Sequence, residues 1–67
     1  MPILSIVMPA YNEEKMIMKA ANSISQLLEK EQINWEILFV NDGSKDNTWQ
    51  EIQRASQEMN NVRGISF

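Results

Sequence analysis

The 67-residue chain contains no cysteine and no histidine. Without cysteine it cannot form disulfides, and without histidine it cannot build a His-ligated metal site. A domain of this size buries a small core, worth roughly 3–5 kcal/mol, and no covalent crosslink adds to it here. The absence of disulfides fits a reducing compartment, so we expect a cytoplasmic location.

Basic residues are few: 6 Lys and Arg stand against 9 Asp and Glu, for a net charge of −3. This balance excludes the basic surface of a nucleic-acid-binding protein and gives no charge attraction to anionic lipid. The first apolar run, Ile3 to Ala10, is too short to span a bilayer and lacks signal-peptide features. We therefore expect a soluble piece with no nucleic-acid partner. Any membrane anchor of a parent protein would lie beyond residue 67.

Short apolar runs alternate with amphipathic stretches along the chain. Runs bounded by turn-forming residues predict strands at about 3–9, 35–41 and 62–67. Between them, apolar residues recur at spacings of three and four, which predicts helices at about 13–31 and 47–60. The apolar face expected for the first helix consists of Ile17, Ala20, Ala21, Ile24, Leu27 and Leu28.

A few residues should set the ends of these elements. Pro9 should end the first strand, because proline has no N–H to donate to a sheet. Asn12 is a favourable N-cap for the first helix, and Asp46 or Asn47 for the second. The order β-α-β-α-β, with connections of this length, predicts parallel strands joined right-handedly. This is half of a doubly wound α/β sheet in one subdomain over 1–67, with the second strand covered on both faces.

Polar loops at 8–14 and 40–46 follow the first two predicted strands. The carboxyl ends of parallel strands meet at one edge of a sheet, where such folds bind ligands, and the helix N-termini that follow attract anions. Tyr11 offers a ring on which a base can stack, and Asp42 a carboxylate that can accept a ring N–H. Gly43 permits close approach or a positive φ. These features predict a nucleotide cleft.

Each of these residues also has a purely structural explanation. Tyr11 could be a surface aromatic after a proline, and Asp42-Gly43 could be no more than a turn. Glu13 and Glu14 could serve only the positive end of the helix dipole.

Two segments at these loops resemble a known family. Residues 5–14 read Ser-Ile-Val-Met-Pro-Ala-Tyr-Asn-Glu-Glu, and residues 36–48 read Glu-Ile-Leu-Phe-Val-Asn-Asp-Gly-Ser-Lys-Asp-Asn-Thr. Both are similar to the start of family 2 glycosyltransferases. Within that family they most resemble polyprenyl-phosphate sugar transferases of the bactoprenol glucosyltransferase and dolichyl-phosphate mannose synthase type.

The resemblance implies a Rossmann-like glycosyltransferase type A fold with strand order 3-2-1. It implies an inverting enzyme that takes a sugar from a nucleotide diphosphate donor, with a UDP-sugar favoured and a polyprenyl phosphate as candidate acceptor. The nucleotide-binding residues that it implies are Pro9, Ala10, Tyr11, Glu13, Asp42 and Gly43. Tyr11 would flank the base, and Asp42 would bind a ring nitrogen. Family members commonly have Asp where this chain has Asn41, an amide that carries no charge.

The family's other functional groups have no counterpart in the chain. There is no Asp-x-Asp triplet, the motif that would bind a divalent cation (Mg or Mn), and no identifiable catalytic base. We expect these groups and the acceptor site to lie beyond Phe67, so the chain alone should be inactive.

Two other functions remain open. Asp42 after a strand also suits a phosphate-binding domain of the signalling type. Alternatively, the chain is a self-associating structural module. In the family's sheet a further strand lies beside the strand 3–9, and without it that edge is free to pair. We expect a homodimer in which two such edges pair antiparallel about a two-fold axis.

Overall fold

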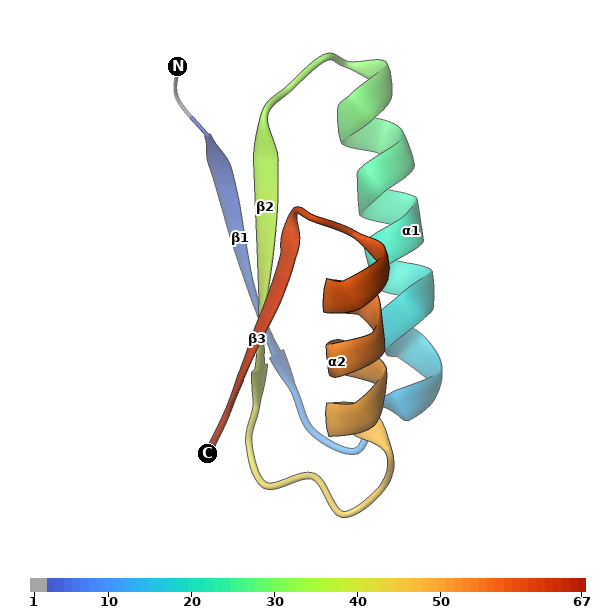
Figure 1. The fold of residues 1–67 in the computed structure, drawn as a ribbon, viewed down its shortest axis with the longest axis vertical. Helices are drawn as coiled ribbons and strands as arrows, with labels where there is room; N and C mark the ends of the chain where they lie inside the picture. The colour runs from blue at the N-terminus through green and yellow to red at the C-terminus, as the bar shows by residue number, and fades with distance from the viewer. Residues whose placement is uncertain (1–2) are drawn as a thin grey trace.

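The fold alternates strands and helices, as the sequence predicts. The computed structural model describes residues 3–67. Its elements are β1 (Leu4–Ala10), α1 (Glu14–Lys30), β2 (Trp35–Asn41), α2 (Thr48–Glu58) and β3 (Val62–Ser66). The β-α-β-α-β order and the single parallel sheet are confirmed (Figure 1).

The three strands form a sheet whose carboxyl ends are level. Its order is β1-β2-β3, which is 3-2-1 when read from the other edge. Ala10 pairs with Asn41, and Asn41 pairs with Ser66. The loops that follow β1 and β2 therefore leave the sheet side by side.

Pro9 does not end the first strand. It pairs with Val40 inside β1, which continues to Ala10. Because β1 is an edge strand, a residue without an N–H is tolerated where it faces away from the neighbouring strand.

Both helices lie on the same face of the sheet (Figure 1). The chain moves in one direction from β1 to β3, and right-handed crossovers then place each helix on the same side. Burial in β2 alternates accordingly: Trp35, Ile37 and Phe39 are buried, whereas Leu38 and Val40 stay partly exposed. The expectation that this strand is covered on both faces is therefore wrong for residues 3–67.

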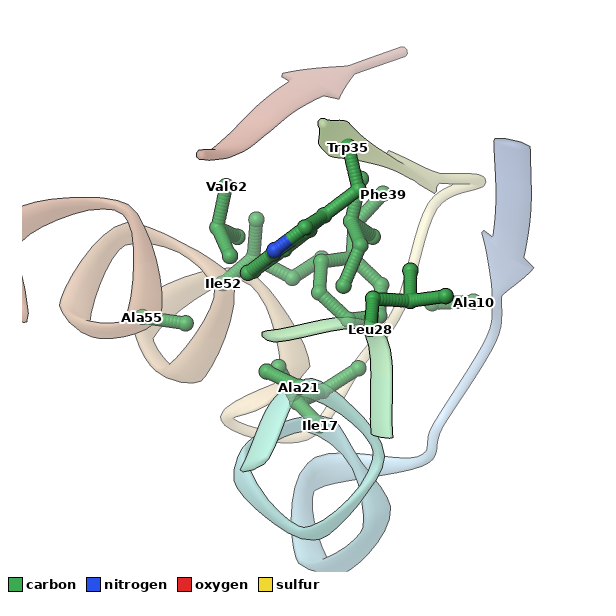
Figure 2. Packing of buried hydrophobic residues seen from close by; sticks show 10 residues of the cluster. Ala10, Ile17, Ala21, Leu28, Trp35, Phe39, Ile52, Ala55 and Val62 are labelled. Carbon is green, nitrogen blue, oxygen red and sulfur yellow. The ribbon is translucent and has the colours of Figure 1, made fainter. Parts of the chain in front are cut away.

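The core lies between this sheet face and the two helices (Figure 2). Its buried apolar residues are Ala10, Ile17, Ala21, Leu28, Trp35, Ile37, Phe39, Ile52, Ala55 and Val62. Leu27, expected in the core, is 59% exposed. One residue turns an α-helix by about 100°, so Leu27 points sideways when its neighbour Leu28 points inward.

Gly64 in β3 faces α2 at close range. A Cβ there would collide with Cγ2 of Ile52 and lie 3.2 Å from the Trp49 ring. Ile52 is fully buried, and its Cγ2 is attached directly to the branched Cβ, so it cannot move aside without disturbing the core. We predict that Gly64→Ala lowers the free energy of unfolding by about 1–3 kcal/mol, the usual cost of overpacking a core.

Urea denaturation followed by tryptophan fluorescence measures this change. Arg63→Ala, at the exposed neighbouring position, is the matched control and should have little effect. Equal stability of Gly64→Ala and the unsubstituted chain would contradict the packing described here.

Candidate functional site

Tyr11 and Asp42 lie at the same edge of the sheet. They directly follow Ala10 and Asn41, which are register partners. The N–H of Asp42 donates to the carbonyl of Ala10 at 3.1 Å and extends the pairing by one step. Tyr11 is 54% exposed, and Asp42 is also exposed. The structure thus brings an accessible ring and an accessible carboxylate to neighbouring loops.

The other predicted site residues surround this pair in different ways. Ala10 is 2% exposed, so it can offer a ligand little besides backbone, whereas Pro9 is exposed. Glu13 occupies the N-cap position of α1 and is exposed. Gly43 has a φ of 67°, and no atom lies within 4 Å of where a Cβ would be. Glycine is favoured there by backbone conformation and not by a close contact.

The first loop (residues 11–13) is hydrogen-bonded to the second loop (residues 42–47) and to the start of α2. Three consecutive N–H groups donate to side chains more than 30 residues away in the chain. These bonds join Asn12 to Ser44 Oγ (3.0 Å), Glu13 to Thr48 Oγ1 (2.7 Å) and Glu14 to Asp46 Oδ2 (3.4 Å). In the other direction, Lys45 N–H donates to Asn12 Oδ1 at 2.8 Å. The two loops form one hydrogen-bonded unit.

The carboxylate of Asp46 is shared between the N-termini of both helices. Its Oδ1 accepts from the N–H of Thr48 at 2.9 Å and from the Thr48 hydroxyl, while Oδ2 accepts from the N–H of Glu14. The Thr48 hydroxyl above all, with these backbone N–H groups, lowers the pKa of Asp46 below its ordinary value. A carboxylate here also suits the positive ends of two helix dipoles.

This arrangement corrects the expectation that the helix N-termini are open to an external anion. The N–H groups of Glu13 and Glu14 already donate to Thr48 and Asp46, and the first N–H of α2 also donates to Asp46. The anion at these helix ends is a side chain of the protein itself. A diphosphate cannot use the same donors without displacing it.

The predicted helix caps are only partly correct. Asn12 is not the N-cap of α1: it has a φ of 52°, and its side chain accepts from Lys45. Asparagine tolerates this left-handed conformation better than most residues, which competes with its capping preference. Asn47 holds the N-cap position of α2 without a side-chain cap bond, and Asp46 supplies that bond instead.

Asn41 is used inside the fold. It is 4% exposed, its Nδ2 donates to Ser66 Oγ at 2.9 Å, and its Oδ1 accepts from the N–H of Ser44 at 3.3 Å. Its side chain therefore connects the end of β3 with the second loop. No buried side-chain nitrogen or oxygen lacks a partner in residues 3–67.

Residues 3–67 show no metal-binding cluster, no pocket and no membrane-spanning helix. No three acidic side chains among them gather in a way that could hold a metal ion, so they do not fit the divalent cation implied by the resemblance. They enclose no pocket, so the nucleotide cleft expected from the sequence is not found among them. Neither helix between residues 3 and 67 has the length and apolar character needed to cross a membrane.

Sequence reasoning missed the importance of Ser44 and Thr48. The pattern Asp46-x-Thr48 is readable as a local cap, because an Asp side chain often bonds an N–H two residues ahead. No local pattern shows that the same side chains also serve a helix that begins near residue 14, since that contact depends on the packing of α1 against α2.

Asp46 should give the protein a characteristic sensitivity to acid. Its pKa in the folded state lies below the unfolded value of about 3.9, so the ionised group stabilises the fold above about pH 4. That contribution is lost as the pH falls through the folded-state pKa. We predict that Asp46→Asn lowers the free energy of unfolding at neutral pH and flattens its decline below about pH 4.

Urea denaturation at a series of pH values measures both effects. Asp42→Asn, which removes a carboxylate of the same loop that accepts no hydrogen bond in the described structure, is the control. If Asp46→Asn and the unsubstituted chain lose stability in parallel on acidification, the shared carboxylate is not what holds the loops.

The sequence of the chain is similar to those of known proteins. Residues 5–67 match the family described as Glycosyl transferase family 2. A dolichyl-phosphate beta-glucosyltransferase of Trichomonas vaginalis is 42% identical over 64 residues, covering 88% of this chain and 20% of that protein. The dolichyl-phosphate beta-glucosyltransferase of Saccharomyces cerevisiae is 43% identical over 56 residues, covering 82% of this chain and 17% of its own length.

A third relative comes from Escherichia coli. It is a UDP-Glc:alpha-D-GlcNAc-diphosphoundecaprenol beta-1,3-glucosyltransferase, 46% identical over 46 residues, covering 69% of this chain and 17% of that protein. The chain thus spans about a fifth of the length of the curated relatives it matches. The two loops described above lie within the matched residues, and the chain belongs to glycosyl transferase family 2.

Proposed function

We propose that this chain forms the nucleotide-binding part of a glycosyltransferase, with Tyr11 and Asp42 on either side of the donor's nucleoside. The observation that carries the proposal is the position of these two residues, one step beyond the paired Ala10 and Asn41. Family membership favours this function over a phosphate-binding domain of the signalling type.

The chemistry of the two side chains favours a base with a ring N–H. An exposed tyrosine ring offers a stacking surface for any base. The Asp42 carboxylate can only accept, so it suits uracil, which carries an N–H at ring position 3, and not cytosine, which has no hydrogen there. The UDP-Glc in the name of the Escherichia coli relative agrees with this preference.

The remaining residues of the proposed site act through backbone and position. Pro9 and Ala10 would supply backbone around the nucleoside, and Gly43 would allow the second loop to turn beside it. Glu13, whose Oε1 accepts from the N–H of Tyr11 at 3.4 Å, would help to hold the first loop near the nucleotide.

The complete reaction needs groups that residues 3–67 do not supply. Inverting sugar transfer requires a base for the acceptor and stabilisation of the departing diphosphate, a task suited to Mg²⁺ or Mn²⁺. The names of the Trichomonas vaginalis and Saccharomyces cerevisiae relatives contain dolichyl phosphate, which supports a polyprenyl phosphate as the acceptor. We propose that the 67-residue chain by itself transfers no sugar.

Binding of UDP-glucose to the chain, measured by calorimetry or NMR titration, tests this function. We predict that Tyr11→Ala weakens binding about fivefold or more through lost stacking, and that Asp42→Asn weakens it about tenfold through loss of a charge-assisted hydrogen bond. CDP-glucose should bind more weakly than UDP-glucose. With Mg²⁺ or Mn²⁺ added, the chain should release no sugar above the buffer background.

Lys19→Ala, on the exposed side of α1, is the matched control and should bind like the unsubstituted chain. Equal affinities for all three variants would refute the assignment of Tyr11 and Asp42 to the site.

The uncovered sheet favours a second role, self-association. Partly or largely exposed apolar residues line the face opposite the helices: Val7, Pro9, Leu38, Val40 and Ile65. The outer edge of β1 is free of any partner strand in the described residues. We propose that two copies pair through β1, antiparallel about a two-fold axis, which would satisfy this edge.

Light scattering at micromolar concentration measures the oligomeric state. We predict a dimer for the unsubstituted chain and a shift toward monomer for Val7→Lys, because a lysine on an edge strand opposes pairing. Leu27→Lys, an exposed position on α1, should leave the dimer intact. A monomer at every concentration tested would exclude this role.

A further inference from the structure

We propose that Thr48 and Asp46 are positioning residues of the nucleotide site, because from the start of α2 and the loop before it they cap α1, whose first residues lie more than 30 residues away in the chain. This inference rests on the function proposed above for Tyr11 and Asp42. It concerns what fixes the distance between these two side chains before a ligand binds.

The N-terminus of α1 has no cap of its own. Glu13 holds the N-cap position without a side-chain cap bond, and Asn12 bonds Lys45 instead. The Thr48 hydroxyl fills this role: Oγ1 accepts from the N–H of Glu13 at 2.7 Å and donates its own hydrogen to Asp46. The next N–H, that of Glu14, donates to the same Asp46 carboxylate at 3.4 Å.

Burial makes the Thr48 bond difficult to replace. Thr48 is 0% exposed, so water has little access to its hydroxyl. Without that oxygen, the N–H of Glu13 would lose its acceptor, which costs more than loss of a bond at the surface. The start of α1 would then have to shift to regain a partner.

Such a shift would reach Tyr11 directly. Tyr11 lies two residues before Glu13, a span of about 7 Å of extended chain. On the other side, Asp42 lies four residues before Asp46, and Ser44, midway between them, accepts from Asn12 at 3.0 Å.

Contacts therefore join the loops at three levels. These are the bond between Ala10 and Asp42 at the sheet, the bonds of Asn12 in the middle, and the bonds of Thr48 and Asp46 at the helices. Tyr11 and Asp42 therefore belong to two loops that these hydrogen bonds hold in a fixed arrangement. A site that is ordered in advance binds more tightly because less freedom is lost on binding.

Two substitutions at position 48 separate the hydroxyl from the packing. Thr48→Val keeps the shape and removes the hydroxyl, whereas Thr48→Ser keeps the hydroxyl and removes a methyl group. If hydrogen bonding matters, valine is the harmful replacement and serine restores function. If only packing matters, the order is reversed.

The experiment combines amide hydrogen exchange of the free chain with titration by uridine diphosphate. We predict that Thr48→Val weakens binding about fivefold and accelerates exchange of the Glu13 and Glu14 amides more than exchange of the Phe39 amide in β2, which reports global unfolding. Thr48→Ser should stay close to the unsubstituted chain in both measurements. Gln57→Ala, exposed on α2, is the control and should change neither.

The outcomes are distinguishable. Unchanged exchange at Glu13 and Glu14 in Thr48→Val would overturn the capping, and faster exchange with unchanged affinity would overturn the positioning role. If the unsubstituted chain binds no uridine diphosphate, the proposed function fails and the positioning role with it, while the exchange data still decide the capping. If Thr48→Val does not fold, Asp46→Asn, which alters the other half of the same cap, carries the test at the Glu14 amide.

Discussion

A single carboxylate shared by two helices holds together the loops at the carboxyl edge of the sheet. Asp46 accepts from the N–H of the first residue of α1 and from the N–H of the first residue of α2. The Thr48 hydroxyl donates to Asp46 and accepts from the N–H of Glu13, which links Glu13 to the same carboxylate. Backbone donors at helix N-termini can bind an outside anion when no capping side chain occupies them. Here they bind an internal one, so the two loops are ordered by the fold itself.

The sheet supplies the second half of this arrangement. Its parallel strands end level at Ala10, Asn41 and Ser66, which places the two loops next to each other before any side chain contributes. Asn41 then links β3 to the second loop through its buried amide. With both helices on one face, the same topology leaves the opposite face uncovered in residues 3–67, and Tyr11 and Asp42 are exposed at the edge of the sheet.

Local patterns predicted most of the fold, and contacts distant in sequence account for the errors. Hydrophobic periodicity was enough for the order of the elements, and parallel register was enough to bring Tyr11 and Asp42 to one edge. The prediction that Asn12 is an N-cap was wrong because its side chain accepts a hydrogen bond from the N–H of Lys45 in the other loop. The prediction that β2 is covered on both faces was wrong because coverage depends on which face the helices occupy, which is a property of the whole topology. Thr48 reads locally as a helix start, and only the packed structure shows it bonding α1.

We propose that the two loops form one nucleoside-binding unit. Intermolecular NOEs between uridine diphosphate and the isotope-labelled chain test it most directly. We expect NOEs from the uracil ring protons to the ring of Tyr11, together with chemical-shift changes at the backbone amides of Asp42 and Gly43. NOEs confined to Val7, Leu38 and Ile65, on the sheet face that the helices leave uncovered, would contradict binding at the two loops.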